Sequence, residues 1–236
     1  KDIKIYTLAY RTSQIFVMKT PKWKYLLSYL MEVHLESSSS EHNEYLHVSL
    51  NKGRLQLSTA NAIYSYADKY ENFYNIFEQI ELNDSIENVL ILGFGLGSIP
   101  YMLEEKFGKE YCYTGVEIDE EVIYLASKYV LSDLKSEVML IEADAINYIH
   151  QCTQTFDLIC IDIFMDDQIP DVFLTSDFLH LVKDSLTDSG LVVFNHLADR
   201  SSYEDKARNY FKDVFKDAFP DGQYLQVRGN GMMVSS

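Results

Sequence analysis

The stretch ENVLILGFGLGSIPYMLEEKFGKEYCYTGVEIDEE, residues 87–121, decides the fold class. It contains an apolar run at residues 89–92, a turn with Gly93, Gly95 and Gly97, a helical segment, a second apolar run and then Glu117. A strand that enters a glycine turn and then a helix brings backbone N–H groups close to a ligand. A carboxylate at the end of the next strand is placed to accept hydrogen bonds from a ribose diol. This stretch therefore predicts a nucleoside-binding unit.

Strands and helices alternate from residue 88 onward, which is typical of a parallel sheet. We expect strands at residues 89–92, 111–116, 138–142, 158–162, 191–195, 224–228 and 232–234. We expect helices at residues 98–106, 120–130, 145–150, 173–186 and 203–218. Gly229-Asn230-Gly231 predicts a tight hairpin turn, so the mostly parallel, seven-stranded sheet ends in an antiparallel strand.

The residues before this pattern predict a small antiparallel β unit. Alternation at Ile3, Ile5, Leu8, Ile15 and Val17 indicates a strand pair, and a short helix at residues 20–30 begins with Thr20 as its N-cap and Pro21 in its first turn. Further strands are expected at residues 31–36, 45–50 and 54–58, the last two joined by Asn51-Lys52-Gly53. We therefore divide the chain into a β-hairpin unit, residues 1–60, and a Rossmann-like domain, residues 61–236.

Aromatic residues between positions 61 and 80 recur at the spacing of one helical face. They are Tyr66, Tyr70, Phe73, Tyr74 and Phe77, with Ile63 before them. We interpret this stripe as core that packs against the sheet. We predict that one or two of the tyrosine hydroxyls in this region face the substrate cleft, and Tyr64 is our candidate.

Composition limits the classes of partner. The formal net charge is -16, which argues against nucleic acid, because binding to phosphates relies on basic patches. An acidic surface is compatible with a cationic substrate, although solubility alone explains most acidic surfaces. No apolar run reaches the roughly 18 residues of a membrane helix, and no signal segment opens the sequence.

Three cysteines without CxxC spacing and histidines without HExxH spacing predict neither a disulfide framework nor a metal site. We interpret Cys112 and Cys160 as buried strand residues in a reducing compartment, and expect the protein in the cytoplasm.

Carboxylates stand at the predicted carboxyl ends of three strands, where open α/β sheets bind their ligands. Glu117, next to Ile118, is assigned to the ribose. Asp119 either caps the next helix or contacts the ligand. Asp144, next to Ala145, either accepts from an adenine amine or caps the short helix that follows.

Asp162 ends the fourth strand and is expected to face the reacting centre. A carboxylate there can bind a cationic amine and take up its proton, provided that its pKa suits the task. The following loop, residues 163–170, is long enough to act as a lid. We interpret Asp166, Asp167 and Asp171 mainly as loop and helix-cap residues, and name Asp166 also as a contact of the acceptor.

Four segments resemble the polyamine synthase (spermidine/spermine synthase) branch of the class I methyltransferase fold. They are ENVLILGFGLGS, TGVEIDEEVIYLASKYV, IEADAINYI and FDLICIDIF, and the second is the most specific. The resemblance implies that the glycine turn and Glu117 hold the ribose and sulfur side of S-adenosylmethionine or its decarboxylated form. It further implies that Asp144 contacts the adenine amine and that Asp162 binds and deprotonates the attacking amine.

Other positions depart from the family pattern. Leu96 stands where the family's glycine turn carries an aspartate that grips the aminopropyl amine. His42-Asn43 stands in place of the family's Tyr-Gln pair, which makes Asn43 a candidate contact of the acceptor. Asp162-Ile163-Phe164-Met165-Asp166 replaces Asp-Ser-Ser-Asp-Pro. The nucleoside half of the site is thus kept, whereas the aminopropyl and polyamine half is rewritten.

The resemblance implies a transferase that moves an aminopropyl or methyl group to a small amine, with no metal. The acceptor is expected to be a small molecule such as a polyamine, and a homodimer is common in similar enzymes. Two alternatives stay open: a small-molecule methyltransferase, and a non-catalytic nucleoside-binding scaffold with the same fold.

Overall fold

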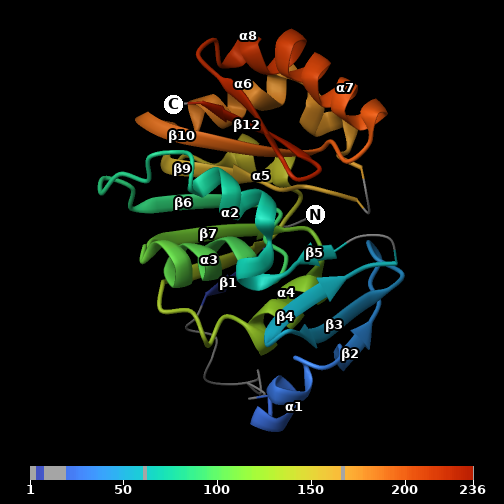
Figure 1. Cartoon of the computed structure of the whole chain (residues 1–236). Helices are drawn as coiled ribbons and strands as arrows, with labels where there is room; N and C mark the ends of the chain where they lie inside the picture. The colour runs from blue at the N-terminus through green and yellow to red at the C-terminus, as the bar shows by residue number, and fades with distance from the viewer. Residues whose placement is uncertain (1–3, 8–19, 61–62, 166–167, 236) are drawn as a thin grey trace.

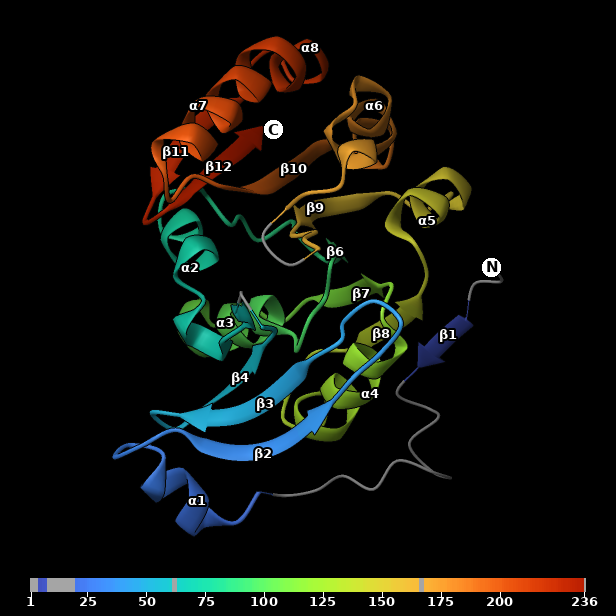
Figure 2. The ribbon, with the colours of Figure 1, turned by 90° about the vertical axis from the view of Figure 1, so that its right-hand side faces the viewer.

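The computed structural model describes residues 4–7, 20–60, 63–165 and 168–235 of the 236-residue chain. These residues form a large sheet and a small sheet, which lies below the large one in Figure 1 and Figure 2. Of the predicted N-terminal strand pair, the residues at positions 3, 8, 15 and 17 lie outside the described residues.

The large sheet has the strand order β1-β8-β7-β6-β9-β10-β12-β11. Five of its strands run parallel: β6 (Asn88–Leu92), β7 (Cys112–Glu117), β8 (Val138–Glu142), β9 (Phe156–Ile161) and β10 (Leu186–Leu197). Strand β12 (Asn230–Ser235) runs antiparallel between β10 and β11 (Gln223–Val227). The predicted seven-stranded sheet with its antiparallel last strand is confirmed.

An eighth strand, β1 (Lys4–Thr7), pairs antiparallel with β8 at one end of the large sheet (Figure 2). We had expected this segment in the N-terminal β unit. The hairpin turn before β12 also differs, because it is formed by Arg228 and Gly229, both with positive φ, one residue earlier than predicted.

The central strand β6 shows why this sheet is buried on both faces. Val89 and Ile91 point into one apolar cluster, together with residues of α3 (Ser98–Phe107) and α4 (Glu120–Tyr129). Leu90 and Leu92 point into a second cluster, with residues of α5 (Ala145–Gln151) and α6 (Ser176–Asp184). A nearly continuous apolar strand is what a parallel sheet covered on both faces requires.

The C-terminal helical region is less regular than predicted. The segment expected at residues 173–186 is a 3-10 turn, η3 (Asp171–Leu174), followed by α6, which ends at Asp184. The segment expected at residues 203–218 starts as α7 (Ser201–Tyr210), passes through one π-helical stretch, η4 (Phe211–Phe215), and ends as α8 (Lys216–Ala218).

The small sheet is antiparallel, in the order β2-β3-β4-β5. Its strands are β2 (Val33–Ser38), β3 (Leu46–Asn51), β4 (Arg54–Ser58) and β5 (Ile63–Ser65), preceded by helix α1 (Lys22–Leu27). The predicted turn between β3 and β4 is formed by Lys52 and Gly53, both with positive φ, as a two-residue hairpin turn requires. This sheet extends past residue 60 through β5.

The aromatic segment at residues 61–80 is not one helix. It comprises β5, the 3-10 turn η2 (Ala67–Lys69) and the helix α2 (Glu71–Phe77). Phe73 and Phe77 are buried, as the interpretation of the stripe required, whereas Ile63 is 51% exposed. Ala67 adopts a φ of 41°, which interrupts any continuous helix at this point.

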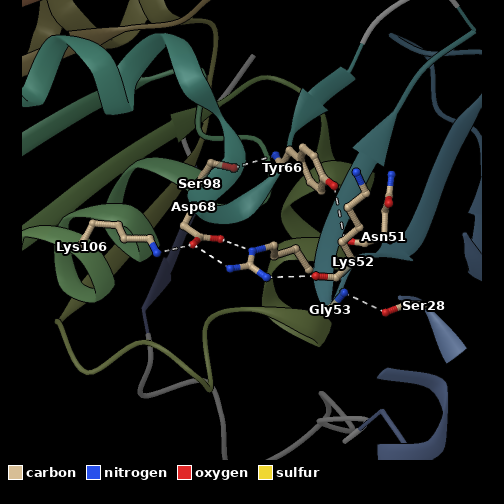
Figure 3. Close-up of polar contacts among 9 residues, drawn as sticks. Ser28, Asn51, Lys52, Gly53, Tyr66, Asp68, Ser98 and Lys106 are labelled. Atoms are coloured by element: carbon tan, nitrogen blue, oxygen red, sulfur yellow. Dashed lines mark hydrogen bonds and ion pairs between the residues drawn. The ribbon is translucent and has the colours of Figure 1, made fainter. Parts of the chain in front are cut away.

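Polar contacts attach this segment and the small sheet to α3 and α4. Figure 3 shows Asp68 of η2 next to Lys106 of α3, and Ser98 next to the backbone N of Tyr66. Arg54 of β4 also pairs with Asp68, at 2.5 Å. At the far strand, Glu36 accepts hydrogen bonds from Lys128 and Tyr129 of α4, at 2.8 and 2.7 Å. The small sheet is thereby held over the carboxyl ends of the parallel strands.

Candidate functional site

The glycine turn joins β6 to α3, and its three glycines all adopt a positive φ, which other residues rarely do. Gly93, Gly95 and Gly97 have φ values of 87°, 55° and 74°. A Cβ on Gly93 would lie 2.2 Å from the backbone oxygen of Asp162, so the absence of a side chain lets β6 and β9 end side by side. Gly97 is the N-cap of α3. The turn therefore exposes backbone at the carboxyl ends of two neighbouring strands.

A cavity of about 830 Å³ lies at these strand ends. Of the predicted site residues, those that line the cavity are Asn43, Tyr64, Gly93, Gly95, Glu117, Ile118, Asp144, Ala145 and Asp162. Gly97 is not among the lining residues, and residue 166 lies outside the described residues. The roles assigned to these residues stay predictions. The volume is within the usual range for small-molecule sites.

Glu117 ends β7 beside the glycine turn. Its carboxylate accepts hydrogen bonds from the backbone N–H groups of Gly95, Ile118 and Asp119, at 3.1, 3.0 and 3.2 Å. Burial raises the pKa of Glu117, against the lowering effect of these backbone donors. Each carboxylate oxygen has two acceptor sites, so the group keeps capacity for further donors from a ligand.

Asp119 proves to be a structural residue. It caps α4, and its second oxygen accepts from Ser40 at 2.5 Å and from Asn43 at 2.7 Å. Asn43 in turn accepts from the hydroxyl of Tyr64 at 3.1 Å. Of the two interpretations that the sequence left open, the structure supports capping, and it shows that the same carboxylate fixes the loop before β3 over the cavity.

Asp144 follows β8 and caps the next helix, as one of its two interpretations predicted, while its contact with an adenine amine stays a prediction. It is the N-cap of α5, where it accepts from the backbone N–H of Ile146 at 3.0 Å, and it also lines the cavity. A cap that uses one carboxylate oxygen leaves the other for a ligand. Its place beside Glu117 follows from the parallel pairing of β7 and β8.

Asp162 follows β9 and lies at the centre of the site. Burial raises the pKa of its carboxyl group to about 7, against hydrogen bonds from Asn195 and Tyr70 that lower it, and the charge of Glu117 adds to the rise. Asn195 donates at 2.8 Å and the Tyr70 hydroxyl at 3.3 Å, both to the same oxygen. A carboxyl group with a pKa near neutrality can take up and release a proton at physiological pH.

Sequence reasoning missed the two partners of Asp162. Asn195 is buried in β10, and its own oxygen accepts from Asn230 at 2.8 Å, which fixes the orientation of the amide. A signal for Asn195 was present, since it is a polar residue at the predicted end of the fifth parallel strand. Tyr70 belongs to the aromatic segment from which one or two tyrosine hydroxyls were predicted to face the cleft, and it lines the cavity. Its contact with Asp162, which spans 92 positions of the sequence, was not predicted.

Leu96 does not take part in the site. It is 3% exposed, belongs to the apolar cluster under the small sheet and is not a lining residue of the main cavity. Leu96 was expected at the position from which the family's aspartate reaches the aminopropyl amine. In this chain the side chain at that position is directed into the core.

The interpretation of the cysteines holds in part. Cys160 is buried in β9, whereas Cys112, at the start of β7, is exposed. Among the described residues, no group of three or more histidine, cysteine, aspartate and glutamate side chains is arranged to hold a metal ion. Among the same residues, no helix is long and apolar enough to cross a bilayer.

Comparison with known proteins identifies the family. The model of the spermine/spermidine synthase domain matches residues 79–228, which is more than half of the chain. The chain belongs to the spermine/spermidine synthase domain family. This confirms the resemblance that the motifs around the glycine turn indicated.

Relatives of this spermine/spermidine synthase domain include two kinds of transferase. A polyamine aminopropyltransferase of Vibrio vulnificus is 30% identical over 156 residues, which cover 65% of this chain and 51% of that protein. The human eEF1A lysine and N-terminal methyltransferase is 26% identical over 139 residues, covering 54% of this chain and 20% of that protein. The chain thus spans about half or less of the length of these relatives.

Solved structures show the same fold in other members and in a methyltransferase. Spermidine synthase from Thermotoga maritima gives a TM-score of 0.63 at 17% identity, covering 86% of this chain and 72% of that one. Human methyltransferase-like protein 13 gives 0.52 at 22% identity, covering 64% and 72%. The class I methyltransferase fold of this spermine/spermidine synthase domain is therefore confirmed.

Proposed function

We propose that this protein is a transferase that binds an S-adenosyl sulfonium nucleoside and moves an aminopropyl or methyl group to a small amine. The observation that carries the proposal is Asp162, a half-buried carboxyl group that lines the cavity beside the glycine turn and whose pKa is raised to about 7 by its surroundings. We also infer that the protein acts in the cytoplasm, which agrees with three free cysteines.

The nucleoside half of the cavity fits such a donor. Glu117 offers acceptor capacity to ribose hydroxyls, Gly93 and Gly95 permit close approach of the backbone, and Asp144 offers an acceptor to an exocyclic amine. Ile118 is 44% exposed and gives an adenine ring an apolar surface. Relatives support the assignment: one solved spermidine synthase is in complex with the transition-state analogue AdoDATO, and human methyltransferase-like protein 13 is in complex with SAH.

The reaction follows from the chemistry of a sulfonium, which makes the carbon next to sulfur electrophilic. An amine forms the new C–N bond to that carbon while the C–S bond breaks, and the thioether leaves. The proton of the ammonium formed by the attack, or of the substrate's own ammonium form before it attacks as a neutral amine, goes to the Asp162 carboxylate. The protein has to position the amine and accept one proton, and Asn195 and Tyr70 hold the accepting carboxylate in place.

A specific observation favours methyl transfer as the second candidate. Because Leu96 is buried outside the cavity, the glycine turn presents no carboxylate to an aminopropyl ammonium. The relationship to the human eEF1A methyltransferase, at 26% identity, points the same way. The proposal therefore includes transfer of either the aminopropyl or the methyl group.

Calorimetry with S-adenosylmethionine, its decarboxylated form and methylthioadenosine tests the proposal. We expect at least one of the three to bind, Glu117→Ala to abolish that binding, and Asp162→Asn to preserve it while turnover falls by about 10²- to 10⁴-fold. Glu120→Gln, a variant of an exposed residue on α4, serves as the control. Failure of all three nucleosides to bind would favour the non-catalytic scaffold.

A further inference from the structure

Three segments meet at the mouth of the cavity beyond Asp162: residues 69–72, 197–203 and 228–230. Arg228 pairs with Glu71, which joins the third segment to the first. The backbone N–H of Ala198 donates to Gly229 at 2.7 Å, which joins the second to the third. Asn230 reaches Asp162 through Asn195, as described above. The mouth is therefore a built surface around the group assigned to proton transfer.

The charges on this surface do not match a polyamine. Its cations are Lys69, Arg200 and Arg228, and its described carboxylates are Glu71 and Asp199. Both carboxylates are already neutralised, Glu71 by Arg228 and Asp199 by Arg200 at 3.6 Å. A polyamine is cationic along its length, and the part of it that lies at this mouth would meet no unpaired carboxylate among these described residues.

Lys69 supplies the remaining positive charge. It lines the cavity directly before Tyr70, whose hydroxyl contacts Asp162. Within the described part of the chain, Lys69 forms no ion pair. The floor of the cavity, by contrast, carries the carboxyl groups of Glu117, Asp144 and Asp162. Among the residues that the structure describes, the cavity thus has an acidic floor and a mouth with a net positive charge.

We infer that the ligand at this mouth carries a carboxylate, held by Lys69, in addition to the cationic group that faces Asp162. The inference rests on the proposed function and narrows its substrate class to a molecule with an amino-acid end. The carboxylate has two sources, the methionine end of S-adenosylmethionine or an amino-acid acceptor. A lysine or arginine that meets a carboxylate forms a charge-assisted hydrogen bond, which discriminates strongly against a ligand without the carboxylate.

Two matched pairs of ligands distinguish the sources. S-adenosylmethionine and its decarboxylated form differ by one carboxylate, as do ornithine and putrescine, the latter two measured in the presence of methylthioadenosine. In the pair that corresponds to the true source of the carboxylate, we expect the carboxylated ligand to bind at least about tenfold more tightly than its partner. Lys69→Gln should abolish this preference for the carboxylated ligand, whereas Lys69→Arg should retain it. Lys22→Gln, a surface control on α1, should leave the preference unchanged.

A second variant gives a reciprocal readout. Arg228→Gln leaves Glu71 without its cation, so we expect weaker binding of the carboxylated ligand and tighter binding of putrescine. Equal or better binding of the decarboxylated member in both pairs, or an unchanged preference in Lys69→Gln, would overturn the inference. Methylthioadenosine separates this failure from that of the proposed function, since it tests nucleoside binding without any carboxylate.

Discussion

The surroundings of Asp162 act on its pKa in opposite directions. Burial raises the pKa, and the donors Asn195 and Tyr70 lower it, which leaves a value of about 7. Both donors contact one oxygen, so the second oxygen can meet a substrate. At the residue scale, the group assigned to proton transfer is one carboxyl group, and its surroundings set its proton affinity.

Removing the charge of Asp162 should stabilise the protein in a pH-dependent way. The folded pKa of about 7 lies above the ordinary value of 3.8, so stability is lost as the pH rises from about 4 to about 7. Asp162→Asn does not ionise and escapes this loss. We expect its melting temperature to exceed that of the wild type at pH 8, with the difference shrinking towards pH 4. A constant difference from pH 4 to pH 8 would show that the pKa of Asp162 is not raised in the folded protein.

Asn195 should act on the reaction through Asp162. Loss of its hydrogen bond in Asn195→Ala removes an influence that lowers the pKa, so the rising limb of the rate against pH should move to higher pH. We expect Asn230→Ala to shift the limb in the same direction but less, because Asn230 only orients the amide. A uniform loss of rate at every pH would indicate a merely structural role.

At the element scale, the 3-10 turn η2 connects the small sheet to α3 through Asp68. Burial alone would raise the pKa of Asp68, but hydrogen bonds from Arg54 and Lys106 outweigh it and hold the pKa at about 2. The three side chains come from β4, η2 and α3 (Figure 3). These two ion pairs of Asp68 therefore stabilise the arrangement of three elements.

We expect Asp68→Asn to lower the free energy of unfolding by about 1–3 kcal/mol at pH 7, measured by urea denaturation. Since the folded pKa lies below the ordinary value, the stabilisation is present above about pH 4 and is lost as the pH falls towards 2. Asp84→Asn is the matched control. Asp84 pairs with Lys109 at 2.8 Å but its side chain is fully exposed, so its loss should cost little.

The glycine turn allows a second comparison between elements. Gly93 and Gly108 both have positive φ, at 87° and 63°, but a Cβ on Gly93 meets the backbone of Asp162 whereas a Cβ on Gly108 meets open space. Gly108→Ala should cost about 1–2 kcal/mol, the strain of a left-handed residue. Gly93→Ala should cost about 3 kcal/mol or more, because crowding adds to that strain. Similar unfolding midpoints for the two variants would contradict this account.

The parallel strands were the elements that the sequence predicted best. Their apolar runs are buried by helices on both faces, so local pattern and final environment agree, as in β6. The segment from β5 to α2 was not predicted. Its path depends on Ala67 at positive φ and on contacts with Ser98 more than 30 positions away, which leave no local pattern.

The same distinction applies to the site. Glu117, Asp144 and Asp162 follow strands of a parallel sheet, so one rule about strand ends was enough to select them, and it would have selected Asn195. The cations at the mouth, Lys69 and Arg228, come from a 3-10 turn and a hairpin turn. Their position is set by how the small sheet and the last hairpin are placed, which strand periodicity does not reveal.

At the scale of the whole molecule, the cavity lies between the parallel strand ends and the small sheet. Asn43 and Tyr64 line it from the side of the small sheet, and Glu117 and Asp162 from the side of the large one. Asp119, the N-cap of α4 beyond the end of β7, accepts a hydrogen bond from Asn43 directly. A ligand in the cavity therefore contacts both halves of the protein at once.

Binding should for this reason reduce local opening on both sides of the cavity. A ligand at 100 times its Kd adds about 2.7 kcal/mol to the free energy of unfolding. Beyond this general effect, we expect hydrogen exchange to slow at residues 40–43 and 63–70 as well as at residues 93–97. Slower exchange confined to one of the two sides would show that the small sheet does not take part in binding.

Strand β1 has a consequence for association between molecules. It covers the free edge of β8, whose backbone N–H and C=O groups would otherwise be open to pairing with another chain. The sequence of β8, Val138-Met139-Leu140-Ile141-Glu142, has the high β propensity of segments that add strands from neighbouring molecules. A short strand of four residues therefore protects this protein against aggregation, and a chain that lacks residues 1–7 should form concentration-dependent oligomers in light scattering.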